Sequence, residues 1–282
     1  MIQLGRMESP LSGLPDFENP PVVETVLGVQ FTAVKGFTLL HYGLYWEKIR
    51  GQYPNAQIVP PLGSASEEFG AEAKPRAIQF SMEIADAPEV RCWFIDDSQN
   101  HLFQVQNDRF IHNWRKVTGD EKYPHYEHIR PKFKEEWVGF CEFLDKQKLS
   151  RPDINQCEVT YVNHIELEGP VKTFSDLPKA ISGWSDASSG RFLPNPEKVT
   201  FKAAYVMSEK KGRLHITVQP VIRSRDGKEV FQLNLTARGK PASSQLNDVL
   251  EWFDLGRGWI VRGFTDFTTP EMHTFWRRTH DR

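Results

Sequence analysis

The sequence predicts an α+β protein made of two similar halves, each an antiparallel sheet with helices packed on one face. Two observations lead to this prediction. Short runs in which apolar and polar residues alternate, as in strands, are followed by longer runs with apolar residues at helical spacing. The order strand, helix, several strands and long helix then occurs a second time. We expect the halves at 22–150 and 151–282, after a flexible arm at 1–21 that is rich in Pro, Gly and Ser.

The elements of the first half follow from the spacing of its apolar residues. Alternation predicts the opening strand. Helical spacing predicts a short helix with Leu40, Leu44 and Ile49 on its apolar stripe, and a long amphipathic helix rich in aromatic residues. A turn signal at 96–100 precedes what reads as a single long strand. In order, the expected elements are a strand at 22–33, a helix at 38–53, a loop at 54–75, strands at 76–84, 89–96 and 101–114, and a helix at 126–148.

The second half repeats this order and adds clear turn and capping signals. Asp226-Gly227 predicts a two-residue hairpin turn, because both residues take positive φ there. Ser243 or Ser244 is expected to cap the long helix, and Thr269, followed by a proline, to open a last one. In order, the expected elements are a strand at 154–167, a helix at 175–184, a loop at 185–197, strands at 199–208, 213–223 and 229–238, a helix at 243–262 and the helix after Thr269.

Two short matches between the halves indicate an internal duplication. Val22-Val23-Glu24 aligns with Gln156-Cys157-Glu158, 134 positions later, and Phe103-Gln104-Val105-Gln106 aligns with Phe231-Gln232-Leu233-Asn234, 128 positions later. The two offsets nearly agree and the matches occur in the same order. A duplicated unit of this kind can form a saddle-shaped sheet, as in TATA-binding-protein-like folds. That analogy concerns the fold and carries no function with it.

Composition and charge argue against several classes of protein. The formal net charge of -2 and the pI near 6.5 give no overall field that would draw the chain to nucleic acid or to an anionic membrane. The three cysteines, Cys92, Cys141 and Cys157, form no disulfide framework or zinc motif. No run approaches the roughly 18 apolar residues of a membrane span, and the N-terminus has no signal-peptide core. We expect a cytoplasmic protein without membrane association.

The most informative pattern is a polar sheet face. Side chains alternate between the two faces of a strand, so the strands at 101–114, 154–167, 213–223 and 229–238 each have one apolar and one polar face. The polar face favours Gln, Asn, His and Arg, which offer directional hydrogen bonds. We expect this face to be open, either to solvent alone or to a partner. Its candidate binding residues are Gln104, Gln106, Arg109, His112, Trp114, Arg115, Gln156, Glu158, His164, Gln232, Asn234 and Arg238.

The sequence contains no catalytic or cofactor motif that we identify. Cys157 and His164 lie seven residues apart on one strand, and therefore on opposite faces, which excludes a dyad on a regular strand. His125 and His128 share a helical face but lack the HExxH carboxylate spacing of a metal site. GxSxG, Walker A and GxGxxG are missing. We therefore expect no cofactor, no metal ion and no catalytic residue that can be named.

Four groups of residues occur together in a specific combination that spans about residues 20 to 278. They are Pro20-Pro21-Val22-Val23-Glu24 with Leu27-Gly28-Val29-Gln30-Phe31, Gln104-Val105-Gln106-Asn107-Asp108-Arg109-Phe110 with Asn113-Trp114-Arg115, Asn155-Gln156-Cys157-Glu158-Val159-Thr160-Tyr161 with Asn163-His164-Ile165, and Thr269-Pro270-Glu271-Met272-His273 with Trp276. In this combination the chain resembles a family of sporadically distributed, uncharacterised bacterial proteins. The resemblance implies no reaction, cofactor or catalytic residue. A patchy distribution is typical of mobile or defence-associated genes.

Three functions remain open on the sequence. The first, favoured by the missing catalytic motifs and balanced charge, is a non-enzymatic recognition protein that binds a partner protein or ligand, or associates with itself, through the polar face. Such a protein would suit an accessory or antitoxin-like role in an antiphage defence or toxin–antitoxin locus. The second is nucleic-acid binding through contacts from Arg109, His112, Trp114, Arg115, Arg223 and Arg238. The third is an enzyme with an unfamiliar site built from Glu24, Glu158, His112 and His164.

Overall fold

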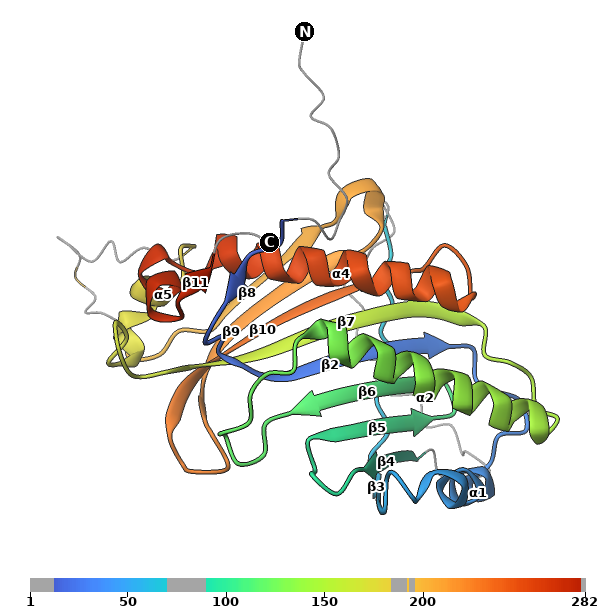
Figure 1. The fold of residues 1–282 in the computed structure, drawn as a ribbon. Helices are drawn as coiled ribbons and strands as arrows, with labels where there is room; N and C mark the ends of the chain where they lie inside the picture. The colour runs from blue at the N-terminus through green and yellow to red at the C-terminus, as the bar shows by residue number, and fades with distance from the viewer. Residues whose placement is uncertain (1–12, 70–89, 184–191, 193–195, 280–282) are drawn as a thin grey trace, which may run out of the picture.

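The main sheet is antiparallel and runs through both halves of the chain (Figure 1). The computed structural model describes residues 13–69, 90–183, 192 and 196–279. In that part of the chain the sheet has nine strands: β2 (Val22–Phe31), β3 (Asn55–Val59), β4 (Arg91–Ile95), β5 (His101–Gln106), β6 (Arg109–Arg115), β7 (Ile154–Glu166), β8 (Phe201–Val206), β9 (Arg213–Ile222) and β10 (Glu229–Gly239). Their order is β3-β4-β5-β6-β2-β7-β10-β9-β8, with every neighbouring pair antiparallel.

Two long helices cover one face of this sheet and lie side by side (Figure 1). They are α2 (Tyr126–Lys146) and α4 (Leu246–Phe267), and each follows the last strand of its half of the chain. The shorter helices are α1 (Leu39–Ile49), α3 (Leu177–Ala180) and α5 (Pro270–Phe275), with short 3₁₀ helices at Phe174–Asp176 and Ser208–Lys210. The α+β class predicted from the sequence is confirmed. Within the described ranges, no helix has both the length and the apolar character that crossing a membrane requires.

The two halves meet where β2 pairs with β7 in the middle of the sheet. Glu24 lies opposite Val162, and Val29 lies opposite Cys157. From this pair, β6, β5, β4 and β3 extend to one side, and β10, β9 and β8 extend to the other. The two expected halves therefore share one sheet and one layer of helices, and both faces of the sheet are continuous across the boundary between them.

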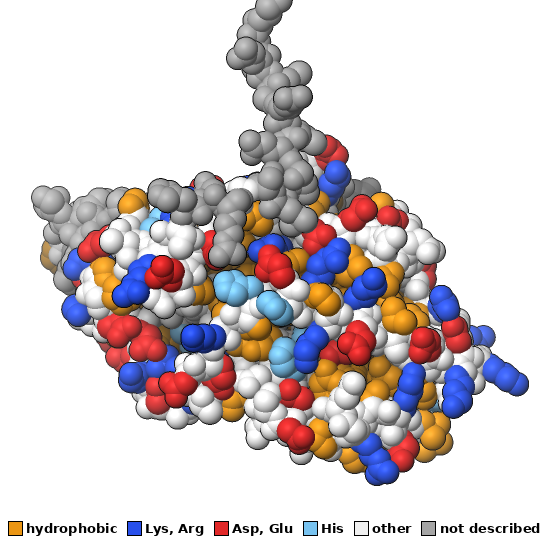
Figure 2. All heavy atoms as spheres, in the orientation of Figure 1, with side chains coloured by type: hydrophobic (Ala, Val, Ile, Leu, Met, Phe, Trp, Pro, Cys, Tyr) orange, Lys and Arg blue, Asp and Glu red, His pale blue; other side chains and the backbone are white. Residues whose placement is uncertain are grey.

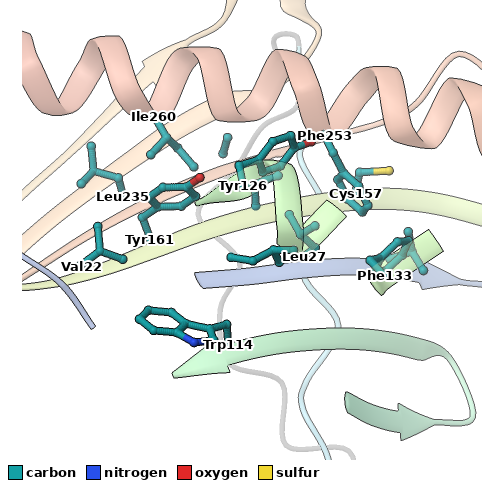
Figure 3. Packing of buried hydrophobic residues seen from close by; sticks show 14 of the residues in the cluster. Val22, Leu27, Trp114, Tyr126, Phe133, Cys157, Tyr161, Leu235, Phe253 and Ile260 are labelled. Carbon is teal, nitrogen blue, oxygen red and sulfur yellow. The ribbon is translucent and has the colours of Figure 1, made fainter. Parts of the chain in front are cut away.

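The core fills the space between the sheet and the two long helices. Phe133 of α2 and Phe253 of α4 meet edge to face, with ring centroids 4.9 Å apart, and Figure 3 shows both among the core side chains. Phe110 of β6 lies beneath Phe133, with centroids 5.8 Å apart. Cys157 of β7 is fully buried, and burial raises the pKa of its thiol well above the ordinary value. Cys157 therefore acts as an apolar core residue, as its strand parity predicts.

The strand predicted at 101–114 is in fact two strands. β5 ends at Gln106, and the chain reverses so that Arg109 of β6 pairs with Gln106. Because the alternation restarts after the turn, the even-numbered side chains point to the polar face in β5 and to the helices in β6. His112 and Trp114 are therefore buried on the helix side and not on the polar face, which corrects their placement from the sequence.

Helix α1 is present, but it buries a different face from the one predicted. Leu40 is 78% exposed and Leu44 is 52% exposed, whereas Tyr42 and Tyr45 are buried. The tyrosine rings carry more apolar area than leucine, and the hydroxyl of Tyr42 also finds a partner, because it donates to the carbonyl of Val90. Both tyrosines lie off the leucine stripe that hydropathy alone identifies. The expected loop after this helix also contains a strand, β3.

The segment expected to be a flexible arm is attached to the body from Asp16 onward. β1 (Asp16–Phe17) pairs with β11 (Arg278–Thr279). The ring of Phe17 packs edge-on against Phe264 of α4, with centroids 5.5 Å apart. A single buried aromatic residue thus docks a segment whose Pro and Gly content is typical of a linker. Predicted segments that fall wholly or mostly outside the described residues are 1–12 of the arm, the strand at 76–84 and the loop at 185–197.

The helix-opening signals at the end of the chain are partly confirmed. The Thr269 side chain accepts a hydrogen bond from the amide of Met272 and caps α5. The cap position of α4 is Gln245, one residue beyond the predicted serines. Ser244 instead accepts a hydrogen bond from the amide of Ile154, at the start of β7. This serine therefore ties the helix entry to the strand.

Replacing Phe133 by alanine is expected to lower the free energy of unfolding by about 3–5 kcal/mol, because the fully buried ring joins α2 to α4 and its loss leaves a cavity. Urea unfolding monitored by circular dichroism measures the change. Leu40→Ala is the matched control on an exposed helix face and should change the free energy by less than about 0.5 kcal/mol. Equal losses from both variants would contradict this account of the core.

Candidate functional site

The polar sheet face, opposite α2 and α4, is crossed by a segment of the same chain. Residues 60–69, which we call the strap, leave β3 at one edge of the sheet and reach β9 near the other. In Figure 1 the strap is the thin blue-to-teal trace that passes behind the strands. The sequence led us to expect an open face, but the strap covers part of it. Loop composition predicts that a segment lacks regular structure, but it carries no information on what that segment packs against.

The first part of the strap is held by its backbone groups. The side chain of Gln106 binds both backbone groups of Leu62. Its Oε1 accepts from the Leu62 amide at 2.9 Å, and its Nε2 donates to the Leu62 carbonyl at 3.1 Å. Nη2 of Arg109 donates to the carbonyl of Gly63 at 2.5 Å. These contacts do not depend on which side chains the bound segment carries. They place two of the predicted binding residues, Gln106 and Arg109, in direct contact with a peptide segment.

The middle of the strap is held in the same way at the boundary between the halves. Oε1 of Gln30 on β2 accepts from the amide of Ala65 at 3.1 Å. Oε1 of Gln156 on β7 accepts from the amide of Glu67, also at 3.1 Å. The predicted residue Gln156 is thus a strap contact. Gln30 has the same role, although it was not among the predicted binding residues.

The end of the strap places a glutamate among three basic side chains. The Glu67 side chain is only 7% exposed and lies 2.6 Å from Arg213, 2.6 Å from His215 and 3.7 Å from Arg238. Burial acts to raise the pKa of this carboxyl, but the hydrogen bonds from His215 and Arg213 outweigh it and hold the pKa below its ordinary value. Arg213 also lies over the ring of Phe69, at 4.3 Å from the centroid.

The polar face near the β4 edge satisfies its own hydrogen bonds. Oε1 of Gln104 accepts from Arg91 at 2.7 Å and from the Trp93 indole at 3.0 Å, and its Nε2 donates to Asn113 at 2.7 Å. The guanidinium of Arg115 lies over the Trp93 ring, at 5.7 Å from the centroid. The predicted residues Gln104 and Arg115 therefore lie on the face, but they serve to order it and do not contact the strap.

The remaining predicted residues lie on β7 and β10. Glu158 accepts from Arg238 at 2.6 Å, and Arg238 in turn lies 3.7 Å from Glu67 of the strap. His164 lies opposite Gln232 in the β7–β10 ladder, and burial lowers the pKa of His164. Asn234 is half-buried between these two groups along β10. The structure thus brings Arg238 to the strap, pairs Glu158 with Arg238, and leaves His164, Gln232 and Asn234 further along the face.

Several of the expected nucleic-acid contacts are already engaged within the protein. Trp114 is buried, with its ring 5.5 Å from that of Tyr123, so it presents no surface for stacking on a base. Arg223 is held by Glu166 at 2.5 Å and by Asp226 at 2.6 Å. These two features weaken the second hypothesis from the sequence. The helix-bearing side of the molecule, opposite the polar face, has acidic and basic side chains interspersed (Figure 2).

The carboxylates considered for acid–base chemistry do not form a pair. Glu158 lies opposite Gly28 in the β2–β7 ladder, four residues along β2 from Glu24. Glu24 accepts from Asn113 at 2.6 Å, and burial raises its pKa. Among the described residues, no three His, Cys, Asp or Glu side chains are grouped to hold a metal ion. Glu24 and Glu158 therefore lie apart along the β2–β7 ladder.

A buried polar network on the helix side was not predicted. Nδ1 of His112 lies 2.7 Å from Oε2 of Glu136, and the hydroxyl of Tyr53 donates to the other carboxylate oxygen. His101 contacts His112 at 3.4 Å, and burial lowers the pKa of His101 to about 4. The network links α2 to β5, β6 and the chain after α1. One feature of the sequence indicates this network. Glu136 lies three residues after Phe133, which places an acidic side chain on the otherwise aromatic face of the helix.

We predict that Glu67→Gln lowers the free energy of unfolding by about 1–2 kcal/mol at neutral pH, because it removes a charge that Arg213 and His215 bind. A carboxyl with a lowered folded-state pKa contributes stability above the ordinary value of 4.5 and loses it as the pH falls further. The gap between wild type and variant should therefore close below pH 4.5. Urea unfolding over a pH series measures it, with the exposed Glu135→Gln on α2 as control; a gap independent of pH would refute the assignment.

Comparison of the sequence with protein-family models and with curated proteins gives no match. What the polar face binds is therefore inferred from its own chemistry. That chemistry consists of amide side chains that bind backbone groups, followed by a basic pocket that binds a carboxylate. Both parts are occupied by a peptide segment within one chain.

Proposed function

We propose that the protein is a recognition protein that binds an extended segment of a partner protein along its polar sheet face, in the place that the strap occupies. The observation that carries the proposal is the row of side chains that bind backbone groups of the strap. Gln106, Gln30 and Gln156 each accept a hydrogen bond from a backbone amide. Such side chains can hold any extended peptide of suitable length.

The spacing of this row supports an extended ligand. The row runs over four neighbouring strands, from β5 through β6 and β2 to β7. Three strand spacings amount to about 14 Å, and the five residue steps from Leu62 to Glu67 span about 16 Å when extended. The two lengths match closely. A helix of the same number of residues would be about 7.5 Å long and would reach only half of the row.

We also propose that the two halves derive from one duplicated unit, as in TATA-binding-protein-like folds. Two features support this. The strand order β2-β6-β5-β4 in the first half corresponds to β7-β10-β9-β8 in the second. This order matches β5 with β9, so it does not support the alignment of Phe103–Gln106 with Phe231–Asn234 on β10. Each series is followed by a long helix, α2 or α4, on the same face of the sheet. In this interpretation the binding row lies across the boundary between the repeats, and each repeat contributes part of it.

The proposal is tested by supplying the strap as a separate peptide. In the test variant, residues 60–69 are replaced by a Gly-Ser sequence of equal length, which leaves every strand of the sheet unchanged. Isothermal titration should show that this variant binds the peptide Pro-Pro-Leu-Gly-Ser-Ala-Ser-Glu-Glu-Phe, and that the wild type binds it more weakly because its own strap competes.

Two substitutions in the strap-replaced protein provide the matched comparison. Gln156→Ala should weaken peptide binding, because it removes a backbone contact. Gln219→Ala alters an exposed glutamine on the same face beyond the strap and should leave binding unchanged. If the strap-replaced protein is folded by circular dichroism and binds no peptide, the proposed function is wrong.

A further inference from the structure

The second half of the sheet holds two arginines directly opposite each other. Arg213 on β9 pairs in register with Arg238 on β10, and His215 lies two positions along β9. Like charges at directly opposite positions destabilise a sheet unless an anion lies between them. Glu158 on β7 binds Arg238 at 2.6 Å. The counter-ion of Arg213 comes from the other half of the protein, since it is Glu67, 146 residues away in the sequence.

The contacts around Glu67 involve its carboxylate and also the two residues that follow it. One carboxylate oxygen of Glu67 faces Arg213 and the other faces His215, so both oxygens are bound. Nη2 of Arg213 also donates to the carbonyl of Glu68 at 2.8 Å, and its guanidinium covers the ring of Phe69. Arg213 thus contacts three successive residues. The pocket fits an acidic residue followed, two positions later, by an aromatic one.

The strap fills this end of the face incompletely. Gln106 binds both the amide and the carbonyl of Leu62. Gln156 is only 4% exposed and binds the amide of Glu67, yet its Nε2 has no acceptor within hydrogen-bond distance among the described residues. A buried donor without a partner is costly. A ligand that presented a backbone carbonyl at this point would satisfy Gln156 better than the strap does.

We propose that Arg213, His215 and Arg238 form a carboxylate-binding pocket for an acidic residue in an extended segment of a partner protein, and that Glu67 occupies it as an internal competing ligand. The inference rests on the proposed function and adds the chemistry of the partner: an acidic residue with an aromatic residue two positions after it. Because the strap is tethered, it competes at an effective concentration of about millimolar. A partner segment therefore binds only if its affinity and concentration are high enough to displace the strap.

The test uses labelled peptides of residues 60–69 and the strap-replaced protein, with fluorescence anisotropy as the readout. A peptide carrying Glu67→Gln should bind about tenfold to a hundredfold more weakly than the parent peptide, because it lacks the charge that the pocket binds. The control peptide carries Glu68→Gln, which removes the same charge one position later, where Arg213 contacts the backbone carbonyl. It should lose less affinity than the Glu67→Gln peptide does, because Arg213 and His215 bind the carboxylate of Glu67.

A substitution in the pocket checks that the effect arises there. Arg213→Gln in the strap-replaced protein should weaken binding of the parent peptide, and the Glu67→Gln peptide should lose little more on this background, because the two changes remove one shared interaction. Additive losses would place the effect elsewhere and would overturn the pocket.

The outcomes separate this inference from the proposed function. If the parent and Glu67→Gln peptides bind the folded protein equally well, the carboxylate pocket is wrong and backbone recognition stands. If neither binds, both are wrong. Should the strap-replaced protein fail to fold, full-length Glu67→Gln is the second test. It keeps the strap but loses the internal carboxylate, and it should bind the parent peptide more tightly than the wild type does; equal affinities would overturn the internal competition.

Discussion

The pairing of β2 with β7 is the constraint on which the rest of the structure depends. These two strands are the first of each half, and their ladder makes one sheet from two sets of strands. With the sheet continuous, α2 and α4 share a single core, in which Phe133 meets Phe253. The same continuity gives the opposite face an unbroken row of polar side chains, and only an unbroken face lets one segment contact residues of both halves.

Much of the fold could be predicted from the sequence because alternation and helical spacing report burial directly. The sequence predictions were wrong where the alternation of apolar and polar residues runs through a turn, and where the buried side chains are not the most hydrophobic ones. The hairpin after Gln106 reversed the parity of the next strand, and so moved His112 and Trp114 to the core side. In α1, tyrosines are the buried residues, because hydropathy undervalues an aromatic ring whose hydroxyl can find a partner.

The sequence predicted which residue types make up the polar face, but it did not predict what they contact. Gln106, Arg109, Gln156 and Arg238 contact the strap as members of the predicted polar face. The strap itself could not be foreseen, since Glu67 carries no local signal that it lies beside a residue 146 positions later. Contacts between a loop and a distant strand depend on tertiary structure, and neither periodicity nor composition encodes them.

The route of the strap has a consequence for the motions of the protein. β3 and β4 are neighbours, with Val59 opposite Arg91, so the strap leaves the sheet beside the start of β4. The strap supplies no strand to the sheet, and its release breaks no ladder. Partial opening of this kind requires less free energy than global unfolding. The strap can therefore detach and dock again while the nine-stranded sheet remains intact.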